Sequence, residues 1–94
     1  MSFVVMVELE RERGADLDAF RRALRAEPQV QQAYYVTGEA DFALICTARD
    51  MDDFEALTRR LFMDSPNVRR FRTSVVMGRT KVGLEVPVEE TEGE

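Results

Sequence analysis

The stretch best suited to binding chemistry runs from Tyr34 to Asp41 and reads YYVTGEAD. A turn at Gly38 can present successive backbone N–H groups to an anion such as a carboxylate. Asp41 follows shortly after and can accept a charge-assisted hydrogen bond from an ammonium group. An α-amino acid carries both charges close together, so this stretch suits that class of ligand. A purely structural interpretation stands beside it, in which Gly38 serves a turn and Asp41 hydrogen-bonds the hairpin backbone.

The remaining residues offer little for catalysis. The sequence has no histidine and a single cysteine, Cys46, so no Ser-His or Cys-His pair is available. Cys46 follows the apolar run 42–45, which predicts a buried thiol that acts as a small hydrophobe. The neighbouring carboxylates Asp52 and Asp53 are better explained as the start of a helix, and the glycines are too isolated to form a phosphate-binding loop. We therefore predict no catalytic residues, no metal site and no cofactor.

The distribution of charge argues against direct contact with nucleic acid. The net charge of the chain is −5, and −4 of this comes from glutamates at its end, namely Glu89, Glu90, Glu92 and Glu94. We therefore expect a folded domain over residues 1–88 with a charge of −1 and a disordered acidic tail over 89–94. A near-neutral domain has little charge with which to neutralise phosphates, and the short basic run 69–72 is typical of a solvated face.

The length of 94 residues predicts a single domain. A domain of this size buries only about 60–65% of the surface of its unfolded chain, so a site between subunits suits it better than a deep internal pocket. The sequence shows no secretory signal and no apolar run approaching the ~20 residues of a membrane span. We expect a cytoplasmic protein that makes no membrane contact.

Hydrophobic patterns predict the strands and the first helix that would position these residues. Runs rich in apolar and β-branched residues favour strands, and such runs cover residues 3–8, 30–37, 41–47 and 68–78. The first helix is expected to begin with Asp16 as its N-cap and to present Leu17, Phe20 and Leu24 on one face. It must end before Pro28, because a proline excludes the preceding residue from helical geometry.

A second helix is expected after Asp50, with Asp53 in a position resembling a capping box. Helical spacing predicts one buried face, with Met51 at one end, made of Phe54, Leu57, Leu61 and Phe62. A turn at 65–67 separates this helix from the last strand. The side chains of that strand that share one face are Phe71, Thr73, Val75 and Met77. Residues 81–88 would add a short extended segment.

The order β-α-β-β-α-β predicts a ferredoxin-like α+β sandwich, in which two helices cover one face of a four-stranded antiparallel sheet. The runs 3–7 and 42–46 are apolar at successive positions, so both faces of these strands should be covered. We predict that the sheet of a second copy covers the face without helices, giving a homodimer of the dimeric α/β barrel type. The alternative is that the C-terminal segment folds back over this face.

The sequence from 30 to 82 resembles the effector-binding domain of the Lrp/AsnC transcriptional regulators. The family pattern has a strand ending V-[TS]-G-x-x-D, a helix beginning D-x-x-x-[FY], then G-V-x-x-x-x-[TS]-x-V-V, and a lysine after the last strand. The residues at these places are Val36, Thr37, Gly38 and Asp41, then Asp50 and Phe54, then Asn67 and Val68, then Thr73, Val75 and Val76, and Lys81. Asn67 departs from the usual glycine, but asparagine also tolerates left-handed turn geometry.

This resemblance implies an assembly and a site. Members of the family dimerise through facing sheets, and the dimers assemble into tetramers or octamers. Amino-acid effectors bind at contacts between dimers, beside the glycine–aspartate loop. By this likeness, Thr37, Gly38 and Asp41 would line the site and Thr73 would contribute from the fourth strand. Full-length regulators of the family would be further partners.

Full-length members carry a helix-turn-helix domain before this one, whereas the first predicted strand here begins at Phe3. We predict a stand-alone module that modulates transcription or metabolism through its assembly state or its partners. The sequence leaves open whether the 94 residues are a natural chain or part of a longer one. Two other hypotheses remain, a small monooxygenase-like barrel enzyme and an assembly partner without a ligand; the absence of histidine removes the usual haem ligand.

Overall fold

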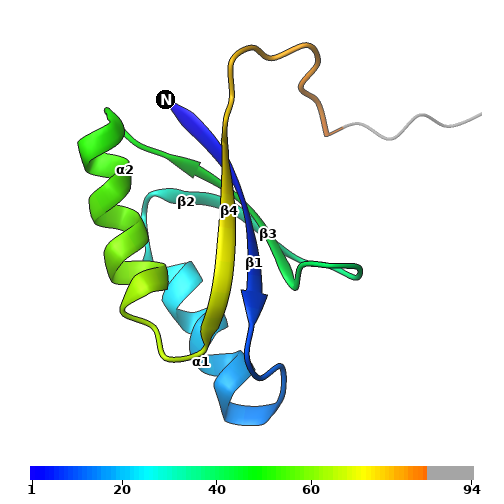
Figure 1. Ribbon diagram of the computed structural model, residues 1–94. Coiled ribbons are helices and arrows are strands. Elements are labelled where there is room, and N and C mark those ends of the chain that lie inside the picture. Colours follow the sequence, from blue (N-terminus) through cyan, green and yellow to red (C-terminus); the bar gives the residue numbers. More distant parts are fainter. Residues whose placement is uncertain (85–94) are drawn as a thin grey trace, which may run out of the picture.

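The computed structural model describes residues 1–84. Over this part of the chain, four strands and two helices follow one another in the predicted order (Figure 1). Their bounds are β1 (Ser2–Leu9), α1 (Gly14–Ala26), β2 (Val30–Tyr35), β3 (Phe42–Thr47), α2 (Met51–Thr58) and β4 (Val68–Val75). A π-helical turn over Arg59–Met63 continues α2. The order confirms the predicted ferredoxin-like α+β fold. Neither helix in residues 1–84 has the length and apolar character that a membrane span requires.

The strands form one antiparallel sheet in the order β2-β3-β1-β4. β1 and β3 are therefore central, and β2 and β4 are the two edges. Both helices lie on the same face of this sheet, as predicted, while the connection between β2 and β3 extends away on the other side (Figure 1). This connection comprises residues 36–41 and is called the 36–41 loop below.

The core lies between the sheet and the helices. The register of β1 and β3 places Phe3 opposite Cys46 and Val5 opposite Leu44, and all four side chains are fully buried. The helices and the π-helical turn cover them with Phe20, Leu24, Phe54, Leu57, Leu61 and Phe62. The rings of Phe3 and Phe54 stack with centroids 3.8 Å apart. Each such side chain contributes roughly 1.5–3 kcal/mol of burial free energy, so this face of the sheet is fixed as the inner one.

The first helix begins earlier than predicted. Its N-cap is Arg13, which is extended and makes no side-chain capping hydrogen bond. The prediction of Asp16 as the N-cap is wrong, because the Leu17 N–H already bonds to the Arg13 carbonyl (3.4 Å), which starts the helix before Asp16. Asp16 lies instead in the first turn, where a carboxylate interacts favourably with the helix dipole and accepts a hydrogen bond from Arg11 Nε at 3.1 Å. The predicted end before Pro28 is confirmed.

The second helix begins as predicted. Asp50 Oδ1 accepts a hydrogen bond from the Asp53 N–H at 2.8 Å, which confirms the N-cap. The Asp53 carboxylate reaches back to the Arg49 N–H at 2.9 Å, one residue before the position that a capping box would use. Met51 is 52% exposed, so its prediction as one end of the buried face is wrong. It lies in the first turn, on the outer side of the helix.

The last strand is shorter than predicted. It ends at Val75; the Val76 N–H still bonds to the carbonyl of Ser2 (2.9 Å), but Ser2 is the first residue of β1, so no residue of β1 remains for further pairing. The predicted shared face is confirmed for the strand itself: the residues opposite Phe3, Val5 and Val7 of β1 are Val75, Thr73 and Phe71. Residues 81–84 form no strand. The remainder of the expected extended segment and the predicted acidic tail, 85–94, lie outside the described residues.

The sheet face opposite the helices, called the open face, is apolar along its centre. Its central side chains are Val4, Met6, Ala43 and Ile45, which are partly buried or, in the case of Met6, 36% exposed. Within the described residues, the C-terminal segment does not cover this face. Met77 and Leu84 are 99% and 91% exposed, and the segment leaves the end of the sheet (Figure 1).

Candidate functional site

The 36–41 loop is held against β1 by hydrogen bonds at its end. The Asp41 N–H donates to the Val7 carbonyl at 2.8 Å, and the Val36 N–H donates to the Asp41 carbonyl at 2.9 Å. The Asp41 carboxylate accepts a third bond, from the Leu9 N–H at 2.7 Å. These bonds replace strand pairing, so β2 and β3 stop short of the predicted bounds. Asp41 thus fixes where the loop lies relative to β1.

Gly38 forms the exposed tip of this loop. Its φ of 111° lies in a region that residues with a side chain rarely adopt. A Cβ at this position would meet no atom within 4 Å, so the glycine is required by the backbone conformation and not by lack of space.

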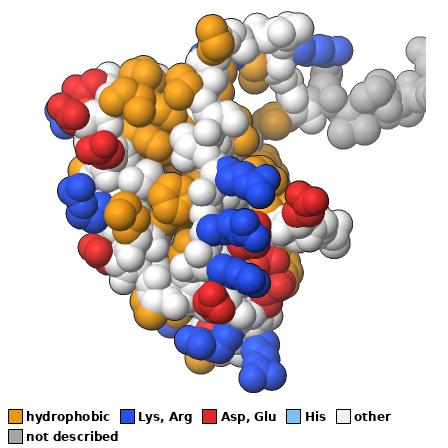
Figure 2. Space-filling model, in the orientation of Figure 1, with side chains coloured by type: hydrophobic (Ala, Val, Ile, Leu, Met, Phe, Trp, Pro, Cys, Tyr) orange, Lys and Arg blue, Asp and Glu red, His pale blue; other side chains and the backbone are white. Residues whose placement is uncertain are grey.

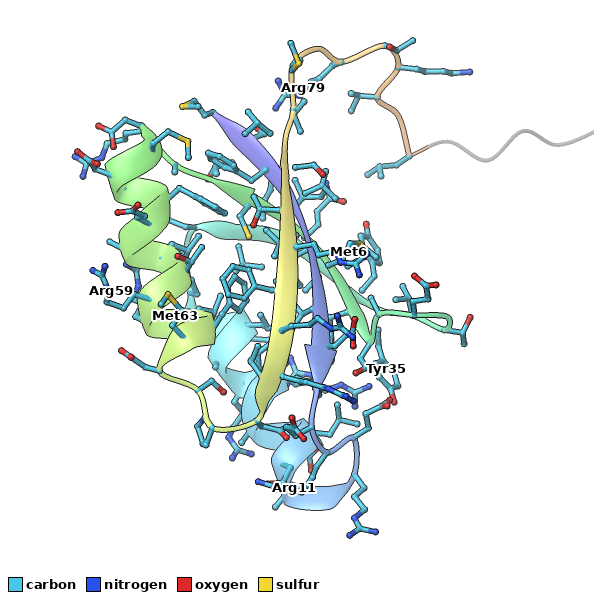
Figure 3. All side chains as sticks on the ribbon, in the orientation of Figure 1. Met6, Arg11, Tyr35, Arg59, Met63 and Arg79 are labelled. Atoms are coloured by element: carbon cyan, nitrogen blue, oxygen red, sulfur yellow. The ribbon has the colours of Figure 1, made fainter. Side chains whose placement is uncertain are left out.

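A hollow of about 240 Å³ lies beside the loop on the open face. Its residues come from three segments: Met6 and Glu8 of β1, then Thr37, Glu39 and Ala40 of the loop, and Arg70 and Arg72 of β4. We call it the loop hollow. Met6 lies on the side of β1 and β4 toward which the loop extends (Figure 3). Figure 2 shows basic side chains in a column along β4, with acidic side chains beside them.

The charges in the loop hollow are only partly compensated. Arg70 Nε lies 3.1 Å from Glu8 Oε2 and forms an ion pair with it. Within residues 1–84, neither Arg72 nor Glu39 forms an ion pair. The hollow therefore presents one guanidinium and one carboxylate that are free to meet a ligand. That combination is complementary to a small zwitterion.

A second hollow, of about 300 Å³, lies between α1 and the edge strand β2. Its charged residues are Arg21 and Arg25, and its lining includes no carboxylate. Arg21 also lies over the ring of Tyr35, 5.1 Å from its centroid. This hollow suits an anion better than a zwitterion.

The single thiol lies in the core, on the inner face of the sheet, and lines neither hollow. Cys46 is fully buried, as predicted. Burial, and to a smaller extent the charge of Glu27, raises the pKa of the Cys46 thiol to about 11. It therefore remains protonated and unreactive near neutral pH. Residues 1–84 contain no cluster of histidine, cysteine and acidic residues arranged to hold a metal ion.

Comparison with known proteins identifies the family. The family model for the Lrp/AsnC ligand binding domain matches residues 2–86. The chain belongs to this family. An HTH-type transcriptional regulator of Sinorhizobium fredii, y4tD, is 46% identical over 95% of this chain and 53% of its own length. The leucine-responsive regulatory protein of Rhizobium meliloti is 30% identical over 88% of this chain and 53% of its own length.

The solved structures support the fold of the Lrp/AsnC domain. The structure of the transcriptional regulator NMB0573 from Neisseria meningitidis, a complex with L-Met, matches with a TM-score of 0.83 at 22% identity. The match covers 92% of this chain and 55% of that one. This chain thus spans about half the length of the curated relatives that it matches, and those relatives are named as transcriptional regulators.

The structure brings three of the four predicted Lrp/AsnC site residues together. Thr37 lines the loop hollow, while Gly38 and Asp41 shape the loop that forms its wall. Thr73 lies elsewhere, because it pairs with Val5 on the helix face of the sheet. Within one subunit Thr73 therefore does not reach the loop hollow, although it neighbours Arg72 in the sequence.

Sequence reasoning did not identify several residues of the loop hollow, namely Met6, Glu8, Glu39 and Arg72. Arg70 and Arg72 alternate with Phe71, which indicates that they share the face opposite to the core. That signal is present in the sequence. The pairing of Arg72 with Met6 depends on the register of two strands that lie far apart in the chain, and no local pattern shows it.

Proposed function

We propose that this chain is an amino-acid-binding and oligomerisation module of the Lrp/AsnC type, which binds its effector at the loop hollow. The observation that carries the proposal is the uncompensated pair of opposite charges beside the 36–41 loop. A volume of about 240 Å³ is below the usual range of drug-sized sites, ~300–1,000 Å³, and suits a single amino acid. The N. meningitidis relative in fold was solved as a complex with L-Met, which makes L-methionine the first ligand to test.

The proposed assembly is a homodimer in which the open faces of two sheets pack together. Support comes from the apolar centre of this face, where Met6 is 36% exposed and Val4 and Ile45 are only partly covered. Sheets that pack face to face lie about 10 Å apart, which buries such side chains without a further layer. Tetramers or octamers of this dimer, and association with full-length regulators, follow the pattern of the family.

In this proposal, Thr73 takes part in a ligand site only at a contact between two copies of the chain. It is exposed on the helix side of the edge strand β4, so it is available to a neighbouring dimer. Thr37, Gly38 and Asp41 would supply the loop wall of one subunit, and Thr73 would come from another. Ligand binding would then change assembly, because an effector can shift an equilibrium only by binding one state better than the other.

Isothermal titration calorimetry with a panel of free amino acids tests the ligand, and analytical ultracentrifugation with and without them tests the assembly. We expect saturable heat for L-methionine or another panel member, together with a shift in sedimentation. No heat and no shift with any amino acid would refute the proposal. An unchanged monomer at micromolar concentration would refute the assembly.

A further inference from the structure

The loop hollow also indicates which residues recognise the ligand, an inference that rests on the proposed function. We propose that Arg72 binds the carboxylate of the amino acid and that Glu39 binds its ammonium group. The hollow would then select free α-amino acids over derivatives that lack either charge.

The fold places these two side chains on opposite walls of the hollow. Arg72 lies directly across from Met6 in the pairing of β1 with β4. Glu39 belongs to the 36–41 loop, which lies on the other side of β1 from β4. The bond from the Asp41 N–H to the Val7 carbonyl holds the loop there. Neighbouring strands lie about 4.8 Å apart, so the backbones of the two walls are separated by roughly 10 Å. Both long side chains border the same hollow and can converge on a small molecule above β1.

The other charges of the hollow do not compete for this role. Arg70 and Glu8 are paired at 3.1 Å, so each already has a partner of opposite sign. Arg72 retains the planar fork of donors that binds a carboxylate through two parallel hydrogen bonds. Glu39 can only accept hydrogen bonds when ionised, which matches an ammonium group and repels a carboxylate.

The floor of the hollow receives the side chain of the ligand. Met6 and Ala40 supply its apolar surface. Methionine is unbranched and adapts its shape to its neighbours, so this floor accommodates apolar ligand side chains of differing shape. Selection therefore rests more on the two charges of the ligand than on the outline of its side chain.

The test combines two variants with ligands that each lack one charge. Calorimetry compares L-methionine, L-methioninamide and N-acetyl-L-methionine on the wild type, Arg72→Gln and Glu39→Gln. Arg69→Gln and Glu55→Gln are matched controls, because both residues are exposed and neither lines the hollow. All substituted side chains are exposed, so circular dichroism should show unchanged folding.

We expect Arg72→Gln to weaken L-methionine binding about 10- to 100-fold, the range for a lost hydrogen bond to a charged group. It should not weaken L-methioninamide further, because that ligand lacks the carboxylate. Glu39→Gln should weaken L-methionine binding by a similar factor. It should not weaken N-acetyl-L-methionine binding further, because that ligand lacks the ammonium group. The two control variants should bind L-methionine as the wild type does.

The outcomes separate this inference from the proposed function. Binding of L-methionine that is equally tight in Arg72→Gln and Glu39→Gln overturns the inference and leaves the proposed function standing. Equal weakening by Arg69→Gln also overturns it, because the effect would then be one of overall charge. If the wild type binds L-methionine, L-methioninamide and N-acetyl-L-methionine equally tightly, neither charge of the ligand is recognised. The assignment of Arg72 to the carboxylate and of Glu39 to the ammonium group is then wrong. Absence of binding by any amino acid overturns both proposals.

Discussion

Replacement of Asp41 by alanine tests whether this residue is structural. Its carboxylate accepts a hydrogen bond from the Leu9 N–H at 2.7 Å, and alanine removes the acceptor. Leu9 is 6% exposed, so water has little access to the N–H that is left. A hydrogen bond to a charged group contributes about 1.5–3 kcal/mol. We therefore expect the free energy of unfolding to fall by about 2 kcal/mol, and Tm by roughly 10 °C for a domain of this size.

Urea denaturation followed by circular dichroism, at one fixed protein concentration, measures this change. Asp41→Asn retains an oxygen acceptor and should lose less than half as much stability. Asp64→Ala is the control, because Asp64 is exposed and its side chain makes no hydrogen bond within residues 1–84; we expect a change within about 0.5 kcal/mol. If Asp41→Ala unfolds at the same midpoint urea concentration as the wild type, the hydrogen bond between Asp41 and Leu9 does not stabilise the loop, and the structural role assigned to Asp41 is refuted.

Gly38→Ala should destabilise the fold by about 1–2 kcal/mol, because the φ of 111° is strained for alanine; a wild-type Tm in calorimetry would contradict this. The Cys46 thiol, with its pKa raised to about 11 by burial, should not react with a thiol reagent at pH 8 until urea unfolds the chain, and rapid labelling of the native protein would show that it is accessible. The hydrogen bonds from Arg60 lower the pKa of Glu27 below its usual 4.5, so this pair stabilises the fold above that pH and the contribution is lost as the pH falls through the folded-state pKa. Glu27→Gln should therefore reduce the acid dependence of Tm, and identical pH profiles would exclude this role. L-methionine should tighten dimerisation in sedimentation experiments; an unchanged dimer would indicate that the loop hollow lies outside the interface, and a weakened dimer would show that the ligand binds the single subunit better.

Local signals in the sequence predicted the elements well. Pro28 marks the end of α1, and Asp50 caps α2 through the Asp53 N–H. The alternation of Phe71, Thr73 and Val75 predicts their shared face. Each of these signals acts over a few residues, through steric exclusion, capping or the two-residue period of a strand. They are therefore available before any tertiary contact is known.

Features that depend on tertiary contacts were harder to predict. Asp16 is a good N-cap by residue type, yet the helix begins earlier, with the bond from the Leu17 N–H to the Arg13 carbonyl. The sequence alone leaves the role of Asp41 open between ligand contact and backbone hydrogen bonding, and the bond from the Leu9 N–H, which is 32 positions away in the chain, supports the structural interpretation. Prediction of the loop hollow would require the register of β1 with β4 and the hydrogen bonds that hold the 36–41 loop against β1. No single segment contains that information.

In the proposed function, the position of the loop hollow provides a link between ligand binding and assembly. It opens on the same face as the apolar centre of the sheet, so a second sheet packed there would take Arg72 and Glu39 out of water. Desolvation of two unpaired charges is unfavourable, and it opposes the hydrophobic gain from residues such as Met6. In the proposed site, a bound zwitterion would supply a partner for each charge and would offset part of this penalty. By thermodynamic reciprocity, a ligand that strengthens the dimer in this way must also bind the dimer more tightly than the single subunit, by the same factor.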